Sequence, residues 1–216
     1  MAPGGLRQST TELMAKPARR NDVEGKRARR RRQVIDAAAA VFAEKGYHGA
    51  STRDIAERLR MQQGSLYYYF PSKDAALEEV CRAGVADFVE GLERIVAGPG
   101  PAERKIRAAV ANHLEPFGER PDYVRTFLFD RHALSREARR EVGALSRRYE
   151  ALLEQLFRDG VASGAFRPDL DGRVATLAFI GACNMAAMRY RPSEKLSLDR
   201  MIAGFADLIL DGVAVR

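Results

Sequence analysis

Apolar residues recur at helical spacing along nearly the whole chain after residue 33, and this periodicity constrains the fold more than any other feature. No stretch of useful length alternates apolar and polar residues as a strand would. Proline and glycine separate the periodic segments, as in GPGP at 98–101. The helices expected beyond residue 73 cover roughly 74–97, 102–116, 121–132, 135–162, 171–190 and 197–213. The sequence therefore predicts an all-α protein.

Three shorter helices are expected before residue 73. The first, QVIDAAAAVFAEKG, is amphipathic and ends at Gly46, a residue that suits the C-terminal cap of a helix. Ser51 can cap a second helix from about Thr52 to Arg58, with Asp54 in the position of a short capping box. A third runs from about Gln62 to Tyr69 and ends before the proline of YYYFP. Three short helices with a tight turn between the last two outline a helix-turn-helix.

The chain of 216 residues has a net charge of +7, and the excess lies in its N-terminal third. Residues 1–73 contain 15 Lys and Arg against 7 Asp and Glu, whereas residues 74–216 contain 21 against 22. The run KRARRRR, from Lys26 to Arg32, leads directly into the first helix. A basic module joined to a neutral one indicates a polyanion binder with a second domain. We therefore expect this run to contact nucleic acid.

These changes in composition predict three parts. Residues 1–28 form a disordered basic arm, because the first 24 residues mix Gly, Pro, Ser, Thr and charges without an apolar period. Residues 29–73 form the three-helix module. Residues 74–216 form a second, larger helical domain.

The stretch GSLYYYFPSK, residues 64–73, places three tyrosines in succession. Successive helical residues point about 100° apart, so three phenols in a row cannot all be buried with their hydroxyl groups satisfied. An outward tyrosine ring can lie against a thymine methyl or a sugar while its hydroxyl bonds a phosphate. Core packing is the alternative, and it suits Tyr68 better than Tyr67.

The motifs FAEKGY, TRDIA and LYYYF-x-x-K, at these spacings within about residues 29–77, resemble the tetracycline-repressor (TetR) family of bacterial transcription regulators. The resemblance implies a recognition helix from Gln62 to Tyr69 in the major groove of double-stranded DNA, and a helical domain over 74–216 that binds a ligand and dimerises. It implies base-facing positions at Gln63, Gly64, Ser65 and Tyr67, base or phosphate contacts from Thr52 and Arg53, and backbone contacts from Tyr68, Tyr69 and Lys73. Arg29 and Arg30 of the basic run complete the expected DNA-binding residues.

The turn before the expected recognition helix departs from the family pattern. Arg60 stands where glycine is common, and left-handed backbone there would cost a non-glycine residue about 1 kcal/mol. Either the turn has another shape or this cost is accepted. Gln62 replaces the usual small residue at the helix start and is a weaker cap. Tyr69 occupies a position where the family more often has histidine.

Two apolar stripes near the C-terminus, over 171–190 and 197–213, match the last two helices of the family, which form its dimer interface. Core packing is the ordinary interpretation of such stripes. Small residues on them would allow the close helix approach of a four-helix dimer contact. The expected interface residues are Leu177, Ile180, Gly181, Met201, Phe205 and Leu208. A two-fold homodimer in turn predicts a palindromic operator.

The segment around 184–192 loosely resembles a subgroup of the family with the pattern N-(x4)-W-Y-R-P, which includes regulators of fatty-acid and sterol breakdown that sense acyl-CoA thioesters. Arg189 stands in the position of the tryptophan. The resemblance implies an acyl-CoA effector, with other small apolar or aromatic effectors as alternatives. The expected ligand-binding residues are Phe127, Phe129, Asn184 and Met188. Phe127 and Phe129 lie close in sequence to several cationic residues and could instead be core aromatics beside solvated charges.

Catalysis, cofactors and metal ions are not expected. The three histidines lack metal-ligand spacing, and no nucleophile motif or phosphate-binding glycine loop accompanies them. Cys81 and Cys183 are interpreted as small buried hydrophobes in a reducing compartment. No apolar run approaches the length of a membrane span, and the first 33 residues lack the apolar section of a secretory signal. We expect a cytoplasmic protein without a membrane partner.

Two other functions remain open at the level of sequence. The arginine-rich run could belong to an architectural protein that binds DNA without sequence preference and with an affinity set by salt. A member of the same family could also activate transcription, because the sign of regulation depends on where the operator lies relative to the promoter.

Overall fold

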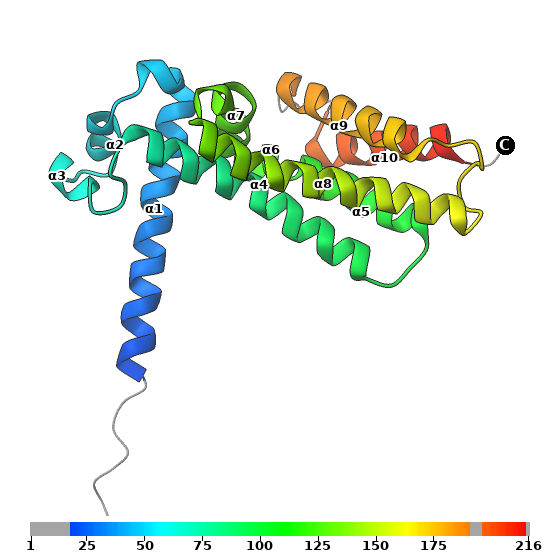
Figure 1. Cartoon of the computed structure of the whole chain (residues 1–216), viewed down its shortest axis with the longest axis horizontal. Coiled ribbons are helices and arrows are strands. Elements are labelled where there is room, and N and C mark those ends of the chain that lie inside the picture. Colours follow the sequence, from blue (N-terminus) through cyan, green and yellow to red (C-terminus); the bar gives the residue numbers. More distant parts are fainter. Residues whose placement is uncertain (1–17, 191–195, 215–216) are drawn as a thin grey trace, which may run out of the picture.

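The computed structural model describes residues 18–190 and 196–214, and these residues form an all-α fold, as predicted (Figure 1). Phe166 and Ala214 form an isolated antiparallel bridge. The helices are α1 (Ala18–Gly49), α2 (Thr52–Arg58), α3 (Gln63–Leu66), α4 (Lys73–Ala97), α5 (Ala102–Leu114), α6 (Pro116–Glu119), α7 (Pro121–Asp130), the 3-10 helix η1 (Arg131–Ala133), α8 (Arg136–Ala162), α9 (Gly172–Arg189) and α10 (Leu198–Val213).

Helix boundaries follow local sequence signals closely. Serine side chains cap four helices, each accepting a hydrogen bond from the backbone N–H three residues further on. These caps are Ser51, Ser72, Ser135 and Ser197. The predicted capping box of α2 is confirmed, since the Asp54 carboxylate also accepts from the backbone N–H of Ser51. Beyond residue 73 every predicted helix is present, and the short α6 separates from the end of α5 at a proline.

Helix α1 differs from the sequence prediction at its beginning. Residues 18–28, expected in a disordered arm, are helical and continue into the rest of α1, while residues 1–17 lie outside the described part of the chain. The other end agrees with the prediction, because the helical backbone breaks at Gly46 with φ 67° and ψ 163°. This conformation is open to glycine and strained for other residues.

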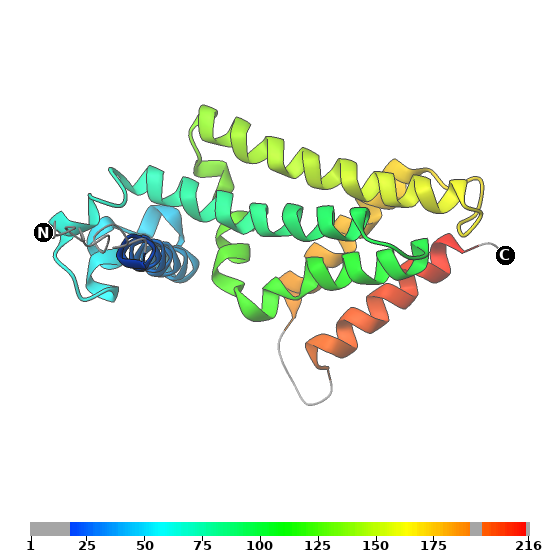
Figure 2. The ribbon, with the colours of Figure 1, turned by 90° about the horizontal axis from the view of Figure 1, so that it is seen from below.

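The helices beyond α3 pack around α4, which leads from the end that carries α1 to α3 into the body of the molecule. Helix α4 packs against α8, α5 and α7, while α9 covers α8 and α5, and α10 lies on α5 (Figure 2). In Figure 2 α1 is seen end-on, beside α2 and α3 at one end of the molecule. Helix α7 lies between α1 and α4 and contacts both.

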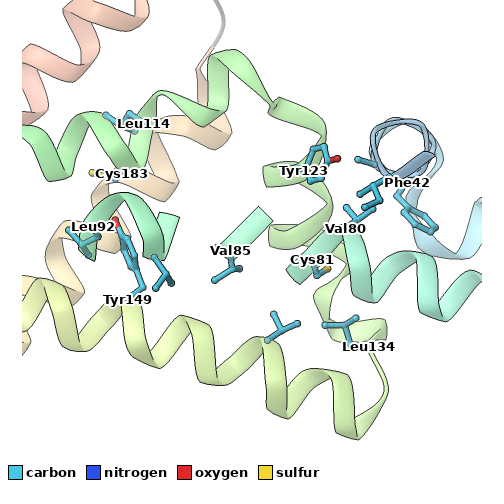
Figure 3. Packing of buried hydrophobic residues seen from close by; sticks show 14 of the residues in the cluster. Phe42, Val80, Cys81, Val85, Leu92, Leu114, Tyr123, Leu134, Tyr149 and Cys183 are labelled. Carbon is cyan, nitrogen blue, oxygen red and sulfur yellow. The ribbon is translucent and has the colours of Figure 1, made fainter. Parts of the chain in front are cut away.

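One continuous core joins the two parts of the protein (Figure 3). It runs from Phe42 on α1 through Val80 and Val85 on α4 to Tyr149 on α8. The two cysteines are buried and unpaired, as predicted, and burial raises the pKa of each thiol to about 12. A thiol with such a pKa is a poor nucleophile and packs as a small hydrophobe.

Candidate DNA interface and effector cavity

Two buried side chains fix the helix-turn-helix and leave its tyrosines outside. Leu66 and Phe70 enter the core together with Ile55 of α2, as their four-residue spacing suggests. Tyr67 is 50% exposed and Tyr68 is 76% exposed. Core packing, which had suited Tyr68 best, is therefore wrong for that residue.

The exposed face of α2 and α3 carries side chains that can form hydrogen bonds with base edges. Arg53, Gln63, Gly64 and Ser65 are exposed, and Thr52 is half-buried. The Gln63 amide Nε2 donates to Thr52 Oγ1 at 2.9 Å and lies 3.5 Å from the Tyr67 hydroxyl. Arg53 Nε donates to Glu57 Oε1 at 2.9 Å. Gln63 thus connects the two helices. Arginine can form two hydrogen bonds with one guanine edge, and glutamine can do so with one adenine edge.

The turn between α2 and α3 keeps a left-handed residue without glycine. Arg60 has φ 51°, and its backbone N–H donates to Glu57 O while Met61 N–H donates to Ala56 O. Of the two alternatives left by the sequence, the left-handed backbone is the one observed, and it costs a non-glycine residue about 1 kcal/mol. Helix α3 is shorter than predicted, because residues 67–69 form a turn rather than helix. Gln62 caps α3 without a side-chain hydrogen bond, as expected of a weak cap.

Tyr69 and Lys73 face the protein more than the predicted phosphate-binding role suggests. Tyr69 is half-buried and packs against the core. The Lys73 ammonium donates to the carbonyl oxygens of Tyr47 and Ala50 at 2.9 and 3.0 Å and lies 4.3 Å from the centre of the Tyr47 ring. Lys73 therefore anchors the loop after α1, and a contact with DNA stays a prediction.

A cavity of about 110 Å³ lies inside the bundle of α4 to α9. Its walls are mostly apolar, and its polar groups come from six residues. The lining consists of Val85, Phe88, His113, Phe117, Val124, Phe127, Leu128, Arg131, Ser146, Tyr149, Glu150, Ile180 and Asn184. Phe127 and Asn184 line it as predicted for ligand-binding residues. Phe129 is exposed with Arg125 over its ring, and Met188 is exposed on α9, so neither reaches the cavity.

His113 is the buried polar centre of this cavity. Its Nδ1 lies 2.9 Å from the Tyr149 hydroxyl and its Nε2 lies 3.1 Å from Asn184 Oδ1. A neutral imidazole that donates from Nε2 and accepts at Nδ1 satisfies both contacts. Burial lowers the pKa of His113 from 6.5 to about 4, against a smaller raising effect of the hydrogen bond with Asn184. The histidine is therefore uncharged at neutral pH.

Helix α7 presents one face to the cavity and another to α1. Val124, Phe127 and Leu128 line the cavity. Other residues of α7 take part in four hydrogen bonds with α1. The Tyr123 hydroxyl donates to Asp36 Oδ1 at 2.6 Å, Arg125 Nε to Ala43 O at 2.9 Å and Thr126 Oγ1 to Ala39 O at 3.3 Å. Asp130 Oδ1 accepts from the Tyr47 N–H at 3.0 Å. Sequence reasoning missed these residues, although the polar face of α7 at 123, 126 and 130 has helical spacing.

Comparison with known proteins identifies the chain. Residues 34–80 match the model described as bacterial regulatory proteins of the tetR family. Residues 99–213 match the tetracyclin repressor-like C-terminal domain.

The chain belongs to the tetracycline repressor (TetR) family.

The match to the following regulators extends along nearly their whole length. The transcriptional repressor KstR2 of Rhodococcus jostii is 28% identical over 92% of this chain and 97% of the relative. The crystal structure of PfmR, a TetR-family regulator from Thermus thermophilus, is 29% identical with a TM-score of 0.77, covering 82% of this chain and 97% of that one. A structure of AibR in complex with isovaleryl coenzyme A and operator DNA has the same fold, with a TM-score of 0.75 at 23% identity over 83% of this chain and 97% of that one.

The last two helices of this TetR-family chain carry an uncovered apolar face. Leu177 on α9 is 56% exposed and Leu208 on α10 is 70% exposed, with Gly181 exposed and Phe205 half-buried. These four residues remain the predicted dimer interface. Two further predicted members lie elsewhere. Met201 is buried in the core, and the half-buried Ile180 lines the cavity.

Other site types receive no support from the described residues. Within residues 18–190 and 196–214 no group of three His, Cys, Asp or Glu side chains could hold a metal ion. No helix in the same ranges is long and apolar enough to span a membrane.

Proposed function

We propose that this TetR-family protein is a ligand-responsive repressor that binds a palindromic operator as a homodimer and is released by a short acyl-CoA. The observation that carries the proposal is α7, which lines the cavity with some side chains and holds α1 with others. The repressor KstR2 and the AibR complex support the regulatory class.

The DNA face would read bases with Arg53, Gln63, Gly64, Ser65 and Tyr67. Because Gly64 has no side chain and nothing lies within 4 Å of where a Cβ would be, α3 can approach the groove closely. Tyr68 would lie on the phosphate backbone, with the arginines of α1 nearby. Contacts of this kind position the protein through phosphates and discriminate sequence through base edges.

The homodimer would form through the exposed face of α9 and α10. Aliphatic side chains as exposed as Leu177 and Leu208 gain free energy when a second copy removes them from water. Gly181 lets the facing helices approach closely, since nothing lies within 4 Å of its Cβ position. A two-fold dimer presents two copies of α3 and so requires a palindromic operator.

The effector would place a short or branched acyl group in the cavity. A volume of about 110 Å³ is well below the roughly 300–1,000 Å³ of pockets that enclose drug-sized ligands, so the CoA moiety would stay outside. Arg131, which is exposed at the cavity and lies 5.0 Å from the Phe127 ring, supplies a positive charge for its phosphates. The neutral His113 with Tyr149 and Asn184 offers hydrogen-bonding groups for the thioester or an oxygenated acyl chain.

Release from DNA would follow from a shift of α7. An acyl group beside Phe127 and Leu128 displaces α7, and the hydrogen bonds of Tyr123 and Thr126 carry the displacement to α1. Helix α4 also contacts the cavity through Val85 and Phe88 and would tilt with it. The effector must bind the DNA-incompetent state more tightly, because only differential affinity shifts an equilibrium.

Selection of bound duplexes from genomic fragments at physiological salt tests this function. The expected result is a few sites that share one palindrome, with release on addition of a short acyl-CoA and no release by free CoA or palmitoyl-CoA. Diffuse recovery without a shared motif would contradict the repressor and favour architectural DNA binding. A palindrome whose binding no acyl-CoA alters would reject the effector class while keeping the specific regulator.

A further inference from the structure

The N-terminal half of α1 is basic, and its residues 25–33 are exposed apart from the half-buried Arg30. We propose that this α1 extension, residues 18–33, lies on the DNA outside the palindrome and lengthens the footprint of each subunit beyond its half-site. The inference rests on the proposed function, since it requires an operator-bound dimer.

Packing shows where the extension leaves the body. Within residues 25–49, Val34 is the first buried side chain, and residues 25–33 are exposed except for the half-buried Arg30. Arg31 makes an ion pair with Glu79 on α4 at 2.9 Å, close to the point where the extension leaves the body. Arg27 and Arg32 make no hydrogen bond or ion pair with the described residues. Their charges are available to a partner.

The α1 extension points away from the predicted second subunit. Figure 1 shows α1 projecting from the end that carries α2 and α3, on the side opposite α9 and α10. A second subunit paired through α9 and α10 would place its own α3 on the side of the molecule where α9 and α10 lie (Figure 1). The extension therefore points outward, toward the DNA that flanks the palindrome.

The length of the extension sets the size of the effect. Sixteen helical residues at 1.5 Å each span about 24 Å, which equals about seven base pairs at 3.4 Å. The cations of Lys26 to Arg32 occupy the half nearest the helix-turn-helix, so the strongest contacts should fall in the first three or four base pairs, by the same rise per residue.

Charge decides the kind of partner. Several cations of the run stand three or four residues apart, and like charges at that spacing destabilise a helix until a polyanion neutralises them. Duplex phosphates supply such a row of negative charges. A lipid surface is the less suitable partner, because residues 25–33, GKRARRRRQ, contain no large apolar side chain to enter the acyl region.

Hydroxyl-radical footprinting tests the inference on a duplex that carries the selected palindrome with long flanks. The variant Arg27→Ala/Arg32→Ala is compared with Arg94→Ala/Arg140→Ala, which removes the same charge from exposed positions on α4 and α8. Each protein is used at saturation, after size-exclusion chromatography and circular dichroism show the same assembly and helix content. The flanks are also trimmed in single base-pair steps, and the affinity of each duplex is measured against salt.

We expect wild type and the α4/α8 variant to protect flanking DNA beyond both half-sites, and the α1 variant to lose that protection while still covering the palindrome. Its slope of log K against log salt should fall by roughly 2–4, because a dimer carries four of these arginines and each phosphate contact contributes about 0.9. Equal flank protection and equal slopes in both variants would overturn the inference. So would arginine-dependent sedimentation with phosphatidylglycerol vesicles in place of flank protection. Absence of palindrome protection in every protein would instead reject the proposed function.

Discussion

The two ends of this protein both expose large side chains, but of different chemistry. At the DNA-binding end the exposed rings are Tyr67 and Tyr68, and Arg53, Gln63 and Ser65 are exposed on the same two-helix unit. On α9 and α10 the exposed side chains include the aliphatic Leu177 and Leu208. A phenol keeps a hydroxyl for a wet, charged surface such as a phosphate backbone, whereas an aliphatic side chain gains only from a dry contact. The difference indicates a polar macromolecular partner at one end and a second copy of the protein at the other.

Helix α7 connects these two ends of the molecule. It holds α1 by hydrogen bonds and borders a cavity whose far wall is α9, the helix that carries Leu177. A ligand in the cavity would touch elements that lead to both proposed partners.

The largest expected effect comes from placing a charge on the exposed apolar face of α9 and α10. Leu208→Glu should convert the dimer to monomer and weaken operator binding by on the order of 10²-fold or more, because each half-site then binds alone. Light scattering and operator titration measure the two quantities. The control is Ala144→Glu, which adds the same charge at an exposed position on α8. A Leu208→Glu protein that stays dimeric would show that the α9–α10 face is not the interface.

Acid should lower the free energy of unfolding in two stages, the first from the buried His113 and the second from Asp54 in the cap of α2. The pKa of His113 falls from 6.5 to about 4 on folding, so below pH 6.5 the unfolded chain binds more protons than the folded one. The free energy of unfolding should therefore decrease by about 3 kcal/mol between pH 6.5 and 4 and level off below. Asp54 in the cap of α2 titrates lower, because Lys45 and Ser51 lower its pKa to about 2. Its contribution is present above pH 4 and is lost as pH falls toward 2.

Urea unfolding at a series of pH values measures this effect. His113→Gln, which cannot take up the proton, should flatten the pH dependence whatever its absolute stability. An unchanged pH slope in that variant would place the titrating group elsewhere.

Truncating exposed side chains of the helix-turn-helix should weaken DNA binding and leave the dimer intact. Arg53→Ala and Tyr67→Ala should each weaken operator binding by roughly 1–3 kcal/mol, because a base or phosphate contact is lost without a change in the core. Fluorescence anisotropy with the selected palindrome gives the affinity, and Arg140→Ala is the matched exposed arginine. Loss of the dimer in either variant would mean that these side chains support the fold.

The smallest expected effect concerns the link between the ends. Tyr123→Phe and Thr126→Val each remove one hydrogen bond between α7 and α1 while keeping the shape of the side chain. Operator affinity without effector should change little, whereas the coupling free energy between acyl-CoA and DNA should fall by roughly 0.5–2 kcal/mol. Ser163→Ala removes a comparable side-chain to carbonyl bond outside the link and should leave the coupling intact. Unaltered coupling in both α7 variants would assign the transmission to α4.

Sequence reasoning succeeded where the determinants are local. The capping box of Ser51 and Asp54 fixed the start of α2, Gly46 marked the break in α1, and the period of apolar residues located the helices of the larger domain. The tyrosine run indicated an outward aromatic face, because three successive phenols cannot share one buried side of a helix. Residues 1–28 were predicted to form a disordered arm, and there local composition misled, since residues 18–28 are helical.

Which apolar residue faces the core and which faces a partner was decided by the tertiary structure alone. Met201 and Leu208 lie on one helix and read alike in sequence, yet the first is buried and the second is 70% exposed. Phe127 and Phe129 are two residues apart, and only Phe127 reaches the cavity. Helical period states which residues share a face, whereas the crossing of helices far apart in sequence determines what that face meets.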